Sequence, residues 1–193
     1  MKKFIVFICL LMILTGCNKR QNEDVINNDD NSSKKVLIVY FSATGNTKAV
    51  AEKLSEKVQA DLYEIVPEDP YSSDDLNYSD DNCRANQEMN DPDCRPEISG
   101  DIIDISDYDV IMIGYPIWWS TMPRIINTFL DMYDLSEKVI MPFCTSGGSS
   151  INQSVNEIRA IETNAEVRDG LRIRNIQDDS IDNWLKENKI VVE

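Results

Sequence analysis

Hydroxyl residues and one glycine are packed into residues 42–47, Ser-Ala-Thr-Gly-Asn-Thr, directly after an apolar run. A helical pattern starts immediately behind this first loop, so its backbone N–H groups would lie at a helix N-terminus, where the helix dipole favours an anion. Ser42, Thr44 and Thr47 would add hydroxyl donors. Gly45 permits a turn that other residues would strain. The loop predicts a phosphate site that needs no cation, although taken alone it could be a plain helix N-cap.

Two more loops follow apolar runs: the second loop, residues 116–121, and the third loop, residues 145–150. The second holds adjacent tryptophans, whose flat faces suit stacking on a ring system, unless one of them packs in the core. The third offers small side chains and N–H groups for the polar edge of a ring, or it is an ordinary turn. The candidate binding residues here are Pro116, Ile117, Trp118, Trp119, Thr145, Ser146, Gly147 and Gly148.

Composition argues against several classes of function. The chain of 193 residues has no histidine, which is the commonest metal ligand and general base, so zinc and serine-histidine chemistry are not expected. A formal net charge of −15 would repel nucleic acid; it either only favours solubility or forms a docking surface for a basic redox partner. The Gly-x-x-x-x-Gly-Lys and Gly-x-Gly-x-x-Gly motifs are absent, which disfavours nucleoside triphosphates and dinucleotides.

Short apolar runs alternate with helical patterns through residues 36–193, which predicts parallel strands joined by crossover helices. The expected strands are 36–41, 62–66, 110–115, 139–144 and a half-exposed edge strand at 167–174. The expected helices are 46–59, 124–133, 152–161 and 180–188, with a short one near 82–89 inside a polar insertion, residues 67–100. This pattern predicts an α/β three-layer sandwich with a five-stranded parallel sheet. The three loops would then meet at the carboxyl ends of the strands, where such sheets bind ligands.

The first seventeen residues indicate export. Two lysines precede an apolar run at 4–14, which is too short to span a bilayer but suits a secretory signal. Leu-Thr-Gly-Cys at 14–17 resembles a bacterial lipobox, which implies a signal peptide at 1–16 and an acylated Cys17; an ordinary signal peptide is the alternative. Residues 17–35 would form a flexible tether. We therefore expect an extracytoplasmic protein, lipid-anchored to the bacterial cell membrane.

The remaining cysteines and the insertion carry further expectations. Outside the cytoplasm Cys83 and Cys94 could form a disulfide, and free thiols are equally compatible with the sequence. Cys144 ends an apolar run and is expected to pack in a strand. The insertion is the expected place for partner or substrate specificity, with Arg84, Glu88 and Arg95 as its candidate residues, unless it is only a solvated loop.

The three loops together resemble those of flavodoxins. Residues 41–47 are similar to the FMN-phosphate loop of that family, residues 107–119 to its next strand and flavin-stacking loop, and residues 145–148 fall at its third flavin loop. The resemblance runs from about residue 36 to the C-terminus. It implies a sheet order of 2-1-3-4-5 and noncovalent FMN. The residues it implies for FMN are Ser42, Ala43, Thr44, Gly45, Asn46 and Thr47 at the phosphate, Pro116, Ile117, Trp118 and Trp119 at the isoalloxazine, and Thr145, Ser146, Gly147 and Gly148 at its pyrimidine edge.

Two departures from electron-carrier flavodoxins bear on function. Residues 115–121 contain no glycine whose peptide could flip toward the reduced flavin, and residues 145–150 contain no aromatic to cover the ring. The missing glycine argues against a stabilised semiquinone, and the open face of the ring shifts weight from a carrier toward a reductase. The expected function is electron transfer through FMN to a redox partner protein or a small-molecule acceptor. The alternatives are an FMN-dependent reductase of quinones or similar acceptors, and a non-redox binding module on the same fold.

Overall fold

The computed structural model describes residues 34–175, 177 and 179–191. The expected signal peptide at 1–16, the acylation site Cys17 and almost all of the tether lie outside the described residues. Within the described ranges, the structure contains no helix that is both long and apolar enough to cross a membrane.

A parallel sheet forms the centre of the domain, with the strand order β2-β1-β3-β4-β5 and β6 also paired to β4. This confirms the predicted order and the flavodoxin-like α/β fold. The strands are β1 Val36–Tyr40, β2 Asp61–Glu64, β3 Val110–Pro116, β4 Val139–Thr145, β5 Glu166–Val167 and β6 Leu171–Ile173. The central strands β1, β3 and β4 read as continuous apolar runs because both faces of a parallel sheet are buried.

The edge strand expected over 167–174 is instead divided into the short strands β5 and β6. The N–H of Arg168 donates to the carbonyl of Ile140 at 2.9 Å, so Ile140 faces this edge. Backbone groups two residues apart on a strand point the same way, so the nitrogen of Pro142 faces the edge too. Proline has no N–H to donate, and the pairing is interrupted there.

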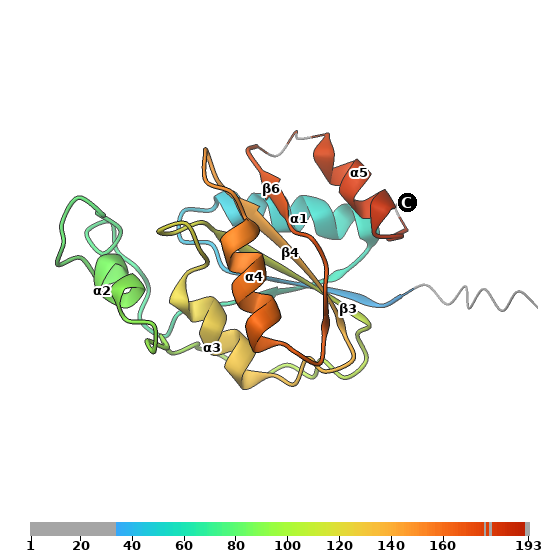
Figure 1. Cartoon of the computed structure of the whole chain (residues 1–193), viewed down its shortest axis with the longest axis horizontal. Helices are drawn as coiled ribbons and strands as arrows, with labels where there is room; N and C mark the ends of the chain where they lie inside the picture. The colour runs from blue at the N-terminus through green and yellow to red at the C-terminus, as the bar shows by residue number, and fades with distance from the viewer. Residues whose placement is uncertain (1–33, 176, 178, 192–193) are drawn as a thin grey trace, which may run out of the picture. The chain divides into compact units, whose positions relative to one another are not determined.

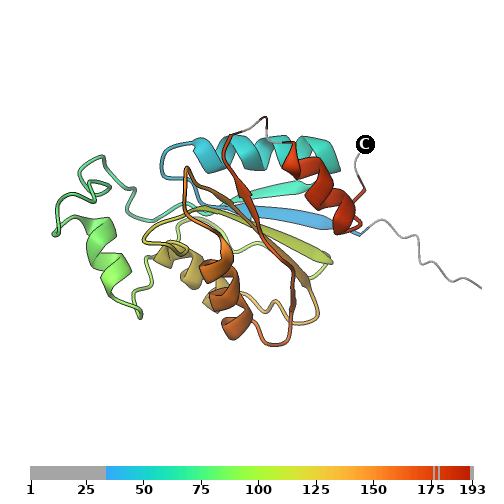
Figure 2. The same cartoon turned by 45° about the horizontal axis from the view of Figure 1, so that its top comes forward.

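Helices cover both faces of the sheet, which gives the three predicted layers. Helices α1 (Asn46–Val58) and α5 (Ser180–Glu187) lie on one face, and α3 (Arg124–Met132) and α4 (Asn152–Ile161) lie on the other (Figures 1 and 2). Their bounds match the predicted helices to within a residue or two, and those of α4 agree at both ends.

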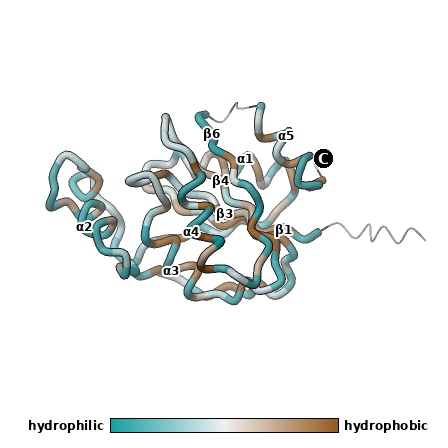
Figure 3. Tube along the Cα trace, viewed as in Figure 1, coloured by the Kyte–Doolittle hydropathy of each residue, from teal (hydrophilic) through white to brown (hydrophobic). Residues whose placement is uncertain are grey.

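Each face of the sheet has its own hydrophobic core. On one face Ile38 of β1 packs in a cluster with Leu54 of α1 and Trp184 of α5. On the other face Val39 of the same strand shares a cluster with Phe129 of α3. Alternate residues of β1 therefore serve opposite cores, as the twofold period of a strand requires. Figure 3 shows the resulting hydrophobic band along the strands.

The insertion, residues 67–100, leaves the sheet after β2 and returns beside its own start. The N–H of Glu68 donates to the carbonyl of Glu97 at 2.9 Å, and the N–H of Ser99 donates to that of Val66 at 2.8 Å. The insertion contains helix α2 (Arg84–Asn90), close to the predicted 82–89, and projects beyond the sheet (Figure 1). These pairings join the two ends of the insertion next to the end of β2.

A buried charged cluster holds the insertion together. Glu88 is 8% exposed and accepts hydrogen bonds from Tyr71 Oη at 2.5 Å and from Arg84 Nε at 2.6 Å. The Arg84 guanidinium also lies over the Tyr71 ring, 4.1 Å from its centre. Arg95, the third residue suggested for specificity, pairs with Asp131 at 2.6 Å. All three charged candidates therefore make contacts that stabilise the insertion.

The possible disulfide between Cys83 and Cys94 is not formed in this structure, where both are free thiols. Cys83 is buried at the start of α2, and its sulfur accepts a hydrogen bond from the Asn86 N–H at 3.4 Å, so it caps the helix. Cys144 is fully buried in β4 as expected, and burial raises the pKa of its thiol to about 12.

Candidate cofactor site

The fold brings the three candidate loops together at the carboxyl ends of β1, β3 and β4. The hydroxyls of Thr47 and Thr145 are hydrogen-bonded at 2.8 Å, which ties the first loop to the third. The N–H of Ile117 donates to the carbonyl of Thr145 at 3.3 Å, which ties the second loop to the third. Residues separated by about a hundred positions in the sequence thus form one connected site.

The first loop ends at an uncapped helix N-terminus. Gly45 adopts a left-handed conformation with φ of 83° as the N-cap of α1, and no side chain among the described residues caps the helix. This excludes the simple N-cap alternative in this structure, and it leaves the first N–H groups of α1 available to a ligand. Nearby, Asn46 Nδ2 donates to Thr44 Oγ1 at 3.1 Å and fixes the exposed Thr44 hydroxyl beside them.

Ser42 supplies a second sign that the first loop is built for a ligand. Its Oγ is buried and has no hydrogen-bond partner in the described part of the chain. Buried hydroxyls are nearly always satisfied, because leaving one unpaired costs about 1–3 kcal/mol. An oxygen-rich ligand at the first loop would provide the missing partner.

The second loop forms a tight turn without glycine. Trp118 and Thr121 exchange two backbone hydrogen bonds of 2.9 Å each, and the residues between them, Trp119 and Ser120, have φ values of 46° and 70°. Both central residues of such a turn need positive φ, which favours Gly or Asn. Non-glycine residues held in this conformation store strain, as is common at functional sites.

The two tryptophans of the second loop have different roles. Trp118 is half-buried and makes edge-to-face contacts with Phe41 at 5.7 Å and with Tyr71 of the insertion at 5.3 Å. Trp118 therefore packs against other aromatic side chains, which is the alternative that the sequence left open for one of the two tryptophans. Trp119 is 43% exposed, so its ring is available to a ligand or partner.

The third loop is held by the neighbouring strand. The N–H of Ser146 donates to the carbonyl of Ile173 at 3.2 Å, and Ser146 Oγ accepts from the Gly148 N–H at 3.3 Å. Arg172 Nη1 also donates to the carbonyl of Gly148 at 3.1 Å. Strand β6 thus fixes the loop from outside, a contact that the sequence did not indicate.

All three loops line one cavity of about 480 Å³, which we call the cofactor cavity. Its size falls within the range of small-molecule sites. Its walls include Thr44, Asn46, Pro116, Thr145, Ser146 and Gly147 from the predicted set. They also include residues that the sequence reasoning missed, namely Ala49, Val50, Arg174 and Asn175.

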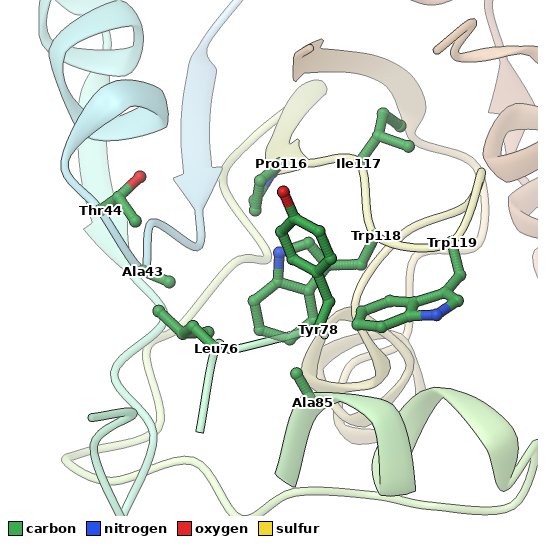
Figure 4. Close-up of a pocket in the computed structure, with 9 residues that line it drawn as sticks. All are labelled: Ala43, Thr44, Leu76, Tyr78, Ala85, Pro116, Ile117, Trp118 and Trp119. Atoms are coloured by element: carbon green, nitrogen blue, oxygen red, sulfur yellow. The ribbon is translucent and has the colours of Figure 1, made fainter. Parts of the chain in front are cut away.

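A second cavity of about 510 Å³ adjoins the first, with Thr44 and Pro116 lining both. We call it the insertion cavity, because the insertion supplies one of its walls (Figure 4). From the predicted set it also contains Ala43, Ile117, Trp118 and Trp119. Its insertion wall consists of Leu76, Tyr78 and Ala85. Four predicted residues, Ser42, Gly45, Thr47 and Gly148, line neither cavity.

The titratable groups below the cavities are poor reactants. Tyr115 is fully buried under the site and donates its hydroxyl to Ser154 Oγ at 2.9 Å. Burial raises the pKa of this phenol far above its ordinary value, as burial also does for the neighbouring Cys144 thiol. Both groups stay neutral near pH 7, and no group of at least three metal-ligating side chains occurs among the described residues.

The sheet order and the three-loop site define a flavodoxin-like α/β protein. A sequence profile of the flavodoxin family matches residues 35–188, and the chain belongs to that family. A candidate flavoprotein from Bacteroides eggerthii DSM 20697 has a similar crystal structure, with 42% identity, a TM-score of 0.78 and coverage of 82% of this chain and 99% of that chain. A flavoprotein from Lactobacillus acidophilus NCFM, crystallised in complex with FMN, is 31% identical, with a TM-score of 0.63 and coverage of 78% and 98%. The comparison with curated proteins gave no match.

The residues present fit FMN, the cofactor that family membership and the Lactobacillus complex support. The uncapped N-terminus of α1 and the unpartnered Ser42 hydroxyl suit a phosphate. The small side chains of the third loop leave its backbone open to a polar ring edge. The cofactor cavity is lined by residues at the start of α1 and by residues of the third loop, so these two parts of the site border one space.

Proposed function

We propose that the chain is a flavoprotein that transfers electrons through noncovalently bound FMN. The observation that carries this proposal is that a single cavity is lined by all three loops expected to bind FMN. Bound FMN would supply the redox chemistry, and the protein would supply binding, orientation and electrostatics.

The chain's own residues would divide this work. The first loop would hold the phosphate through Thr44, Asn46 and the N–H groups that begin α1. The second loop would bear on the ring through Pro116, and the third would meet its polar edge through backbone groups at Gly147. Arg174 in the wall of the cavity brings a positive charge that the anionic cofactor would favour.

The direct test is to purify residues 36–193 and titrate them with FMN, following the quenching of flavin fluorescence. We expect saturation at one FMN per chain. A protein that takes up no FMN would leave the non-redox binding module as the function of this fold and refute the proposal.

A substitution in the first loop tests the phosphate assignment. Thr44→Ala removes an exposed hydroxyl that would donate to the phosphate, so we expect FMN affinity to fall about 10-fold or more. Riboflavin, which lacks the phosphate, should bind equally to both proteins. Thr163→Ala, an exposed threonine beyond α4, is the matched control and should change neither affinity. Equal losses for FMN and riboflavin would contradict the assignment.

A second candidate function, an FMN-dependent reductase of small molecules, is favoured by the third loop, because residues 145–150 contain no aromatic side chain to cover the flavin ring. Rapid mixing of the reduced, FMN-loaded protein with acceptors separates the two functions. Saturation of the rate with acceptor concentration would support a reductase, and a strictly linear dependence would support a carrier.

We further propose that the domain is tethered outside the cytoplasmic membrane by an acylated Cys17. The lipobox-like sequence at 14–17 and the polar segment that follows support this proposal. Labelling cells with radioactive palmitate should mark the wild-type protein and leave the Cys17→Ser variant unlabelled. Label retained by the variant, or a wild-type protein without label, would refute it.

A further inference from the structure

The second loop is bonded to a glutamate of α4 that lies outside both cavities. Thr121, the last residue of the loop, is 5% exposed, and its Oγ1 donates a hydrogen bond to Glu157 Oε2. Glu157 lines neither cavity. We propose that Glu157 is a positioning residue for the cofactor, which holds the second loop in the conformation that meets the flavin ring. This proposal rests on the proposed function, because it assigns a role at the same site.

The turn at the end of the second loop needs support from outside. Trp119 and Ser120 have φ values of 46° and 70°, and a non-glycine residue keeps such a conformation only where the surrounding structure imposes it. Thr121 closes the turn through its two backbone hydrogen bonds with Trp118. A bond that fixes the Thr121 side chain therefore fixes one end of the turn from which Trp118 and Trp119 project (Figure 4).

Glu157 is itself held in place. Gln153, one turn earlier on the same face of α4, donates from Nε2 to Glu157 Oε1 at 3.0 Å. Each oxygen of the carboxylate therefore has its own donor, Thr121 for one and Gln153 for the other. A charged acceptor forms a stronger hydrogen bond than a neutral one, and partial burial of Glu157 reduces competition from water.

Helix α4 is anchored to the sheet independently of Glu157. Ser154 Oγ accepts a hydrogen bond from Tyr115 of β3 at 2.9 Å and donates to the carbonyl of Ile151 at 2.8 Å. Ile151 is the N-cap of α4 and directly follows the third loop. Loss of the Glu157 carboxylate should therefore release the second loop and leave α4 and the third loop in place.

Hydrogen exchange of the protein without FMN tests the contact itself. Glu157→Ala removes the acceptor and introduces a strong helix former. We expect the amide hydrogens of Trp118 and Thr121 to exchange at least tenfold faster, with wild-type rates in β3. Glu56→Ala, which removes an exposed glutamate of α1, is the control and should alter neither. Unchanged exchange of the two loop amides, or equal acceleration in β3, would overturn the proposal.

Titration with two flavins tests the role in cofactor binding. The second loop would bear on the ring, which FMN and riboflavin share, so Glu157→Ala should weaken both by the same factor, about fivefold or more. This pattern differs from that of Thr44→Ala, which should weaken FMN alone. Unchanged affinities, or a loss confined to FMN, would contradict a role at the ring.

Rescue separates the hydrogen bond from a general loss of packing. Glu157→Gln keeps an oxygen acceptor for Thr121, so its riboflavin affinity should lie within about twofold of wild type. Thr121→Val removes the donor at nearly constant shape and should reproduce the loss seen with Glu157→Ala. Because both variants break the same bond, the double variant should lose no more than either single one. A glutamine variant as weak as the alanine variant, or additive losses, would overturn the proposal.

The wild-type titration keeps this proposal apart from the proposed function. If wild-type protein binds FMN and Glu157→Ala binds it equally well, only the positioning role is wrong. If wild-type protein binds neither flavin, the proposed function fails and the role toward the cofactor fails with it. The exchange experiment, which needs no flavin, then still reports whether Glu157 holds the second loop.

Discussion

Tyr71 offers a sharp test of what fastens the insertion to the domain. Tyr71→Phe keeps the ring contacts with Trp118 and Phe41 and removes only the hydroxyl that donates to Glu88 at 2.5 Å. A hydrogen bond to a charged group is worth about 1.5–3 kcal/mol. Glu88 keeps its bond to Arg84 at 2.6 Å, so we expect a loss near the lower end, about 2 kcal/mol.

This loss should appear as easier opening of the insertion and not as unfolding of the sheet. Native-state hydrogen exchange of α2 measures the opening, and about 2 kcal/mol corresponds to roughly 30-fold faster exchange. Tyr78→Phe, in the same segment but with an exposed ring, should leave the exchange rates unchanged. Wild-type exchange of α2 in the Tyr71→Phe variant would refute the reasoning, as would an equal acceleration in β1 and β3.

Three further predictions follow from other parts of the structure. A Cβ at Gly114 would lie 2.2 Å from the Phe143 ring, so Gly114→Ala should lower the free energy of unfolding by about 1–3 kcal/mol, as measured by urea denaturation. Gly147 has open space around it, so Gly147→Ala is the control and should change the free energy of unfolding by less than about 0.5 kcal/mol. Ser120 has φ of 70°, so Ser120→Gly should relieve strain and raise the unfolding free energy by up to about 1 kcal/mol, and a clear loss of stability would contradict the strain. Burial raises the pKa of Tyr63 to about 12, and the Asp61 carboxylate raises that of Tyr108 to about 12, both from 10.0. Their stabilisation is complete below pH 10 and is lost as the pH rises through about 12, which unfolding titrations across this range should detect.

The sequence predicted most of the fold because the strongest signals coincided with buried elements. Strand β1 and helix α4 were visible as an unbroken apolar run and as an amphipathic period, and tertiary packing preserved both. The divided edge strand could not be foreseen, because its cause is Pro142 on the neighbouring strand. Proline inside an apolar run reads as part of that strand, and its effect is visible only when the partner strand is known.

In the candidate site, too, the sequence indicated local features but not contacts between distant segments. The first loop could be predicted because its hydroxyl residues and Gly45 precede a helical pattern, which indicates a helix N-terminus open to an anion. Arg174 falls at the end of the predicted edge strand 167–174, and the sequence does not place it in the site, because its approach to the cofactor cavity depends on how β6 lies beside β4. The sequence indicated that the insertion contributes to specificity, but it did not indicate which of its residues lie beside the second loop. The contact between Tyr71 and Trp118 joins two segments that no local sequence pattern connects.

Pro142 has a consequence beyond the shape of the sheet. A long regular edge strand presents a continuous row of backbone donors and acceptors, on which a second molecule can add a strand and begin aggregation. Here the outer edge consists of β5 with two residues and β6 with three, separated by the interruption that the proline imposes. One missing N–H inside the sheet therefore leaves this edge with less continuous backbone on which another chain could add a strand.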